Sequence, residues 1–119
     1  MADVVVRLEA GLTARGITLF ARVDHAAGAA AAGMALRPTT VLIFGNPKGG
    51  TPLMQAGQTI GLDLPLRILA WEDATGQVRL TYPDLAALAR RHGIDPAPQQ
   101  TLAALTALLV AITNEAAAP

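Results

Sequence analysis

Two segments of alternating apolar and polar residues, 64–71 and 77–82, are separated by a short turn that ends in Gly76. Alternation with a period of two is typical of strands that bury one face. Glycine supplies the positive φ that a tight hairpin turn needs. Two strands joined by such a turn run antiparallel, whereas parallel strands need long crossovers. The hairpin therefore predicts an α+β fold with a mostly antiparallel sheet.

Helical and extended patterns fill the rest of the chain. Apolar residues at helical spacing predict helices, and β-branched or alternating runs predict strands. The patterns predict a helix over 3–15, a strand over 17–24, a short helix over 25–34, a strand over 39–44, and helices over 51–61, 84–93 and 99–117. We expect these elements to form a single domain of residues 1–119, because a chain of this length is typical of one domain.

Single residues add detail to these elements. Asp3 and Asp84 are suited to cap the helices that follow them, and Thr51-Pro52 has the form of an N-cap followed by proline at the first helical position. The run 39–44 lacks polar alternation, so we expect a central strand that is buried on both faces. The alanine-rich segment 25–34 predicts a helix packed closely against the sheet.

The composition disfavours several classes of protein. Nine basic residues balance nine acidic ones, whereas a nucleic-acid binder needs a basic face. Cysteine and serine are absent and histidine occurs twice, which removes the thiol and serine nucleophiles and leaves a weak signal for metal. We therefore expect no nucleic-acid partner, no metal and no cofactor.

We also looked for segments that direct a protein to a membrane. The N-terminus lacks a basic region followed by an apolar one. The longest apolar stretch, 102–112, is about half of the ~20 residues that span a bilayer. These observations predict a cytoplasmic protein with no membrane partner.

The best candidate for a ligand site is the segment 45–52, where a glycine-rich turn leads toward a helix. Backbone N–H groups and the positive end of a helix dipole can receive an anion at such a place. Lys48 is the only lysine of the chain and lies in this segment. The candidate ligand-binding residues are Gly45, Asn46, Lys48, Gly49, Gly50 and Thr51. The alternative is a tight connection between a strand and a helix with no ligand.

Two further residues are candidates for acid–base chemistry. His25 follows a strand end and Glu72 opens the hairpin turn. If strand 64–71 lies beside strand 39–44, Glu72 can approach Lys48 or His25. An enzyme would then use His25 and Glu72 as acid–base groups and Lys48 to hold substrate charge. The alternatives are a surface or capping histidine and a solvated turn. His92 ends a helix, where its charge complements the dipole.

Five stretches of the sequence resemble the domain of unknown function 302 family. The most specific is Phe44-Gly-Asn-Pro-Lys-Gly-Gly-Thr-Pro-Leu-Met-Gln55, and the others are 16–25, 36–44, 62–73 and 85–93. The resemblance covers about residues 4–114. It implies a β-α-β(4)-α fold of the TATA-binding-protein-like type, with helices on one face of the sheet, usually as a homodimer. The family pattern begins with a strand before the first helix, whereas this sequence starts inside that helix. Either the start of the sequence is placed too late, or the sheet forms without that strand.

Three hypotheses about function follow. The leading one is a homodimer that binds a small ligand near 45–52, with an anion as the candidate ligand. The second is the enzyme that uses His25, Glu72 and Lys48. The third is a structural or assembly protein whose sheet or terminal helix serves a partner.

Overall fold

A computed structural model describes residues 1–94 and 97–118. Four strands form one sheet in the order β1-β2-β3-β4, and each neighbouring pair is antiparallel. The strands are β1 (Thr18–Asp24), β2 (Thr39–Gly45), β3 (Leu66–Glu72) and β4 (Val78–Thr81). The predicted hairpin is confirmed as β3 and β4, and Gly76 in its turn has φ +83°. The α+β class and the antiparallel sheet are likewise confirmed.

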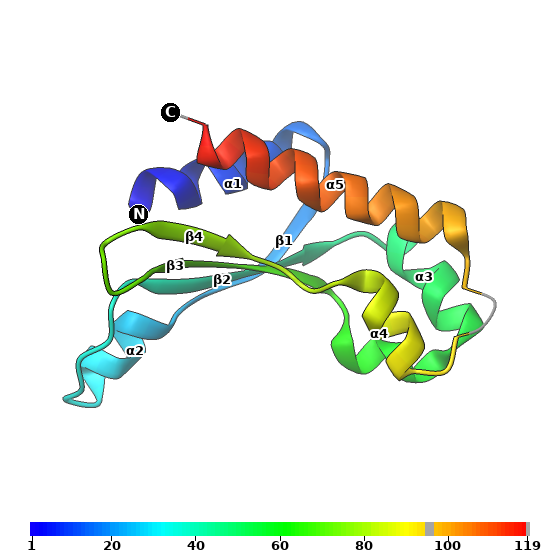
Figure 1. The fold of residues 1–119 in the computed structure, drawn as a ribbon, viewed down its shortest axis with the longest axis horizontal. Coiled ribbons are helices and arrows are strands. Elements are labelled where there is room, and N and C mark those ends of the chain that lie inside the picture. The colour runs from blue at the N-terminus through cyan, green and yellow to red at the C-terminus, as the bar shows by residue number, and fades with distance from the viewer. Residues whose placement is uncertain (95–96, 119) are drawn as a thin grey trace.

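Helices lie over one face of the sheet and beyond its ends (Figure 1). They are α1 (Ala2–Ala14), α2 (His25–Ala31), α3 (Pro47–Ala56), the 3₁₀ helix η1 (Gln58–Asp63), α4 (Leu85–Arg91) and α5 (Gln99–Ala117). Helices α1 and α5 lie side by side over the sheet. Helices α3 and α4 gather with η1 beyond one end, and α2 lies at the other end.

One face of the sheet, which we call the covered face, carries the hydrophobic core. Leu42 pairs with Ile68 and Phe44 pairs with Leu66 across β2 and β3. Directly opposed residues share a face, and these four side chains are buried. Apolar residues of α1 and α5 complete the same core, among them Leu8, Leu12, Leu102, Leu109 and Ile112.

The other face, which we call the open face, is only half-buried. It carries Val41 and Ile43 of β2, which pair with Leu69 and Arg67 of β3, and Trp71, which pairs with Thr39. The prediction that strand 39–44 is buried on both faces is therefore wrong. A continuous apolar run does not reveal how many layers cover a sheet, and in the described residues helices cover one face of β2.

Polar contacts fasten α1 in place. Arg7 Nε donates to the carbonyl of Ala116 at 2.8 Å, which ties α1 to the end of α5. Glu9 accepts from Arg22 of β1 at 2.8 Å.

Asp3 does not cap α1 as predicted, because the N-cap position is Met1 and no side chain caps it. Asp84 does cap α4, since its Oδ1 accepts from Ala87 N at 3.2 Å.

The segment predicted to pack on the sheet behaves differently. Helix α2 forms, but none of its residues is buried. Alanine favours the helix, yet it offers too little apolar surface to anchor it. In the described part of the chain, β1 and β4 are the edge strands of the sheet.

Candidate functional site

The glycine-rich segment is the start of a helix. Asn46 caps α3, and its side-chain Oδ1 accepts a hydrogen bond from Gly49 N at 3.1 Å. Pro47 occupies the first helical position. The prediction of a cap at Thr51-Pro52 is therefore wrong, because the helix begins one turn earlier. Asn46-Pro47 has the same cap-and-proline form, and asparagine is preferred over threonine as an N-cap.

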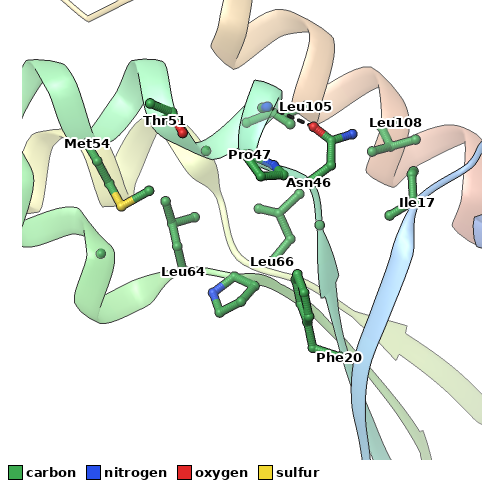
Figure 2. Close-up of a pocket in the computed structure, with 15 residues that line it drawn as sticks. Ile17, Phe20, Asn46, Pro47, Thr51, Met54, Leu64, Leu66, Leu105 and Leu108 are labelled. Carbon is green, nitrogen blue, oxygen red and sulfur yellow. Dashed lines mark hydrogen bonds between the residues drawn. The ribbon is translucent and has the colours of Figure 1, made fainter.

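A cavity of about 310 Å³ lies between the start of α3 and the side of α5. We call it the α3–α5 cavity. Figure 2 shows that its walls come from α3, α5, the end of β1 nearest α3 and the segment that enters β3. Its lining is mostly carbon, and the residues are Ile17, Phe20, Gly45, Asn46, Pro47, Gly49, Gly50, Thr51, Met54, Gly61, Leu64, Pro65, Leu66, Leu105 and Leu108. The volume is within the range of small-molecule pockets.

Glycines allow α3 to approach its neighbours closely. A Cβ placed on Gly49 would lie 3.0 Å from Cδ2 of Leu105. A Cβ on Gly50 would lie 3.5 Å from Cδ1 of Leu64, which is ordinary contact. A Cβ rarely lies within 3.0 Å of another carbon, so a larger residue at position 49 would push against Leu105. Glycine at this position therefore allows α3 to pack closely on α5. The glycines predicted to hold an anion thus also shape an apolar wall.

The predicted ligand residues divide into two sets. Five of them line the α3–α5 cavity: Gly45, Asn46, Gly49, Gly50 and Thr51. Lys48 is exposed and is not among the lining residues. The polar groups at the cavity are few, and Asn46 is the one whose orientation a hydrogen bond fixes. The cavity therefore offers an apolar surface with a polar rim.

The three residues of the enzyme hypothesis do not come together: His25 and Glu72 lie at one end of the sheet, and Lys48 lies beyond the other end. His25 follows Asp24, which pairs with Thr40 near the start of β2, and Glu72 N donates to the carbonyl of Pro38. Lys48 follows the other end of β2. A strand rises about 3.3 Å per residue, so roughly 20 Å of β2 separates the two ends. Strand β3 does lie beside β2, but its antiparallel direction carries Glu72 away from Lys48.

The pair Glu72 and Asp73 is also more than a solvated turn. Asp73 accepts hydrogen bonds from the Thr75 hydroxyl at 2.7 Å and from Arg79 Nε at 2.8 Å. These two contacts, the hydroxyl first, hold the pKa of Asp73 well below its usual value. The carboxylate thus organises the hairpin turn.

Sequence reasoning missed a cluster that joins α4 to η1. The His92 side chain is 8% exposed, and its Nε2 donates to Asp63 Oδ2 at 2.5 Å. Its Nδ1 shares a hydrogen bond with the Thr59 hydroxyl at 3.0 Å. The His92 hydrogen bond, with smaller help from Arg91, holds the pKa of Asp63 below its usual value. Because these residues are far apart in the sequence, no local motif could have revealed the cluster.

Comparison with known families now adds to the geometry. Residues 1–112 match the family described as Domain of unknown function DUF302. The chain belongs to the DUF302 family. The resemblance stated from the sequence is confirmed, since the match covers nearly the whole chain. Asn46 and the glycines around it lie inside the matched region.

A solved structure shows the same fold. It is the crystal structure of an uncharacterized conserved DUF302 protein from Bacillus stearothermophilus, and its TM-score with this chain is 0.85. The two chains are 20% identical, and the match covers 98% of this chain and 90% of the other. At this identity the likeness shows the fold alone, and it confirms the predicted fold class.

Curated relatives carry a different kind of name. Fluoride-specific ion channel FluC 1 of Brucella suis, FluC 1 of Brucella abortus and FluC 2 of Brucella melitensis are each 46% identical to this chain over 117 residues. The match covers 98% of this chain but 46%, 43% and 43% of the relatives. This DUF302 chain therefore spans less than half the length of the curated relatives it matches.

The relatives overturn the prediction of a cytoplasmic protein with no membrane partner. An ion channel is a membrane protein, and the similarity extends over nearly the whole of this chain. That prediction rested on these 119 residues alone, whereas more than half of each relative lies outside the match. By length and composition, α5 is apolar enough to cross a membrane, although Leu109 and Ile112 pack in the core. A core helix passes the same test.

Proposed function

We propose that this DUF302 domain binds a small, largely apolar ligand in the α3–α5 cavity and that it works beside a membrane protein. The observation that carries the first part is the cavity itself. It is open to solvent, has a volume of about 310 Å³ and is lined mostly by carbon. Concave apolar pockets with a few fixed polar groups are the usual form of ligand sites.

The names of the curated relatives support the membrane setting. In this proposal the matched region accompanies a channel rather than forming its pore, because the apolar stripe of α5 is used in the core. Co-expression with the unmatched part of the Brucella suis relative tests this. We expect the two to be purified together from detergent-solubilised membranes. A chain that never enters the membrane fraction would contradict the proposed partner.

We further propose that the domain is a homodimer that pairs through the open face. Val23, Val41 and Leu69 form one cross-strand row on this face, and Ile43 and Trp71 flank it. Val23 is 40% exposed. In a monomer these side chains would leave an apolar patch in water, and such patches mark interaction surfaces.

Sedimentation of single substitutions tests the dimer. Glutamate at Val41 would place a charge in the middle of the row formed by Val23, Val41 and Leu69, so Val41→Glu should sediment as a monomer while the wild type sediments as a dimer. The control is Val6→Glu, because Val6 is 60% exposed on α1, away from the open face. A wild type that is monomeric at every concentration would remove the dimer proposal.

A pair of glycine substitutions tests ligand binding. Gly50 faces the cavity, and a leucine side chain there would extend toward Leu64 and Met54. Gly28 of α2 has no atom within 4 Å of an added Cβ, so Gly28→Leu is the matched control. We expect indole and 1-naphthol to raise the Tm of the wild type and Gly28→Leu, because a ligand stabilises the folded state that binds it.

The same shift should be absent in Gly50→Leu, whose side chain occupies the cavity. If all three proteins shift equally, the probes bind elsewhere and the cavity is not their site. If a wider panel of apolar probes of this size leaves the wild type unchanged, the ligand-binding proposal is wrong. Circular dichroism of each variant shows that the helices remain folded.

A further inference from the structure

Asn46 presents a fixed hydrogen-bond donor to the α3–α5 cavity. Its Oδ1 is committed to Gly49 N at 3.1 Å, and this contact sets the orientation of the amide. Figure 2 shows the amide oxygen turned toward the helix and the amide nitrogen turned away from it, on the side of Ile17 and Leu108. Asn46 is exposed, and among the hydrogen bonds of the described residues the one that its side chain makes is through Oδ1. The two N–H bonds of Nδ2 are thus available to a ligand.

The charges around the cavity favour an acceptor that is negative. No aspartate or glutamate is among the lining residues. Lys48 follows Pro47 on the exposed side of the same helical turn, and no described carboxylate pairs with it. A carboxylate at the rim would accept from Asn46 Nδ2, and charge-assisted hydrogen bonds are the stronger ones. Lys48, two residues along the chain from Asn46, supplies the positive charge of this helical turn.

The size of the cavity limits the rest of the ligand. A cavity of ~150 Å³ lined by apolar side chains can hold benzene. The α3–α5 cavity, at about 310 Å³, has room for roughly two such rings or for a medium-length alkyl chain. Its walls offer carbon atoms from Met54, Leu64 and Leu105 but few polar partners. The body of the ligand must therefore be apolar, because buried polar groups without partners are costly.

We propose that the ligand is an amphipathic organic carboxylate whose apolar body, a bicyclic ring or a medium-length alkyl chain, fills the α3–α5 cavity and whose carboxylate accepts from Asn46 Nδ2. This inference rests on the proposed ligand binding and adds the chemical class of the ligand. It also gives the residues singled out in the sequence separate roles. The glycines shape the wall, Asn46 holds the head group and Lys48 adds charge at the rim.

Two matched probe pairs separate the head group from the body. They are 1-naphthoate with 1-naphthalenemethanol, and decanoate with decanol, each tested by calorimetric titration at neutral pH. We expect each carboxylate to bind the wild type at least tenfold more tightly than its alcohol. The variant Asn46→Asp keeps the N-cap oxygen, since aspartate caps as well as asparagine, but replaces the donor with a negative charge.

In Asn46→Asp we expect the carboxylates to lose at least tenfold in affinity and the alcohols to change less than threefold. Lys48→Gln should weaken the carboxylates alone, by a smaller factor. Equal binding of carboxylate and alcohol to the wild type would overturn the assignment of ligand class and leave the cavity as an apolar site. Failure of all four probes, together with indole and 1-naphthol, would overturn the proposed ligand binding as well.

Discussion

Helices α2 and α3 begin in the same way and end in different surroundings. Helix α2 begins directly after β1, and α3 begins two residues after β2 ends. Each helix is capped by a side-chain oxygen that accepts a hydrogen bond from the backbone N–H three residues later. Asp24 accepts from Ala27 N at 2.9 Å, and Asn46 accepts from Gly49 N at 3.1 Å. Yet α2 has no buried residue, whereas α3 buries Leu53 completely and borders a cavity.

The difference shows what local signals can and cannot decide. A capping side chain and good helix formers are enough to start a helix. Whether the helix then becomes a wall of a site depends on the elements that reach it from elsewhere in the chain. Helix α5 and η1 reach α3, while α2 extends past the end of the sheet (Figure 1).

The largest expected effect is the loss of the α3 anchor. Leu53 is fully buried, and Leu→Ala at such a site costs about 2–5 kcal/mol of unfolding free energy. In α2 the comparable change is Ala29→Gly, which weakens the helix by about 1 kcal/mol; because no residue of α2 is buried, little of this loss should appear in the global unfolding free energy. Urea denaturation measures both variants. Similar losses at the two sites would mean that α2 is anchored as firmly as α3.

The sequence predicted the elements better than it predicted their surroundings. The hairpin, the Asp84 cap and the last helix at 99–117 depend on local alternation, capping and periodicity, and all three are confirmed. The start of α3 was misplaced because Asn46-Pro47 and Thr51-Pro52 carry the same signal. Strand β2 was predicted to be buried on both faces, but helices cover one face. The apolar sequence of β2 does not show how many layers of structure pack on the sheet.

The two histidines make the next contrast. His92 is buried and bonds to both Asp63 and Thr59, whereas His25 at the start of α2 is exposed. We expect His92→Ala to lower the unfolding free energy by about 1–3 kcal/mol, because the variant loses a buried imidazole together with its hydrogen bonds to Asp63 and Thr59. His25→Ala should change it by less than about 0.5 kcal/mol.

Titration of Asp63 by NMR sharpens this prediction. The hydrogen bond from His92 is the largest cause of the lowered pKa of Asp63. In His92→Ala that pKa should rise toward its ordinary value, and in His25→Ala it should not move. A carboxyl group whose pKa is lower in the folded state than in the unfolded state stabilises the fold at any pH above its unfolded pKa. This stabilisation is lost as the pH falls through the folded-state pKa. The wild type should therefore lose more stability than His92→Ala between pH 5 and pH 2.

Removing the caps of α2 and α3 should have a smaller effect on stability. The two variants distinguish local unfolding of one helix from unfolding of the whole domain. Asp24→Ala and Asn46→Ala each remove a side-chain acceptor, which costs about 1 kcal/mol of helix stability. Helix α3 is anchored in the core, so we expect Asn46→Ala to lower the global unfolding free energy by about that amount. In Asp24→Ala the faster amide exchange should be confined to α2, and the urea midpoint should barely change.

The candidate site was predictable in part. Five of its six expected ligand residues line the cavity, because a turn signal after a strand marks where the backbone comes close to other elements. The apolar character of the cavity was not predictable, since Leu64, Leu105 and Leu108 come from segments distant from Asn46 in the sequence. Their approach depends on how α5 crosses the end of the sheet.

The smallest expected effects come from methyl groups added to the two helices. Gly50→Ala replaces a helical glycine, and its new Cβ meets Leu64 and Met54 at ordinary contact distances of 3.5 Å and 3.7 Å. Such a change stabilises by about 0.4–1 kcal/mol, because the unfolded chain has fewer conformations to lose. Gly28→Ala enters open space and should stabilise α2 locally.

Gly49→Ala distinguishes a roomy cavity wall from a tight one. Its Cβ would lie 3.0 Å from Leu105, so Leu105 must shift and the gain in stability should vanish or reverse. Urea denaturation of the three variants should rank Gly50→Ala above Gly28→Ala and Gly49→Ala lowest. If Gly49→Ala stabilises as much as Gly50→Ala, α3 and α5 are not held together by the close approach that glycine allows. The cavity between them would then be an adaptable surface rather than a preformed site.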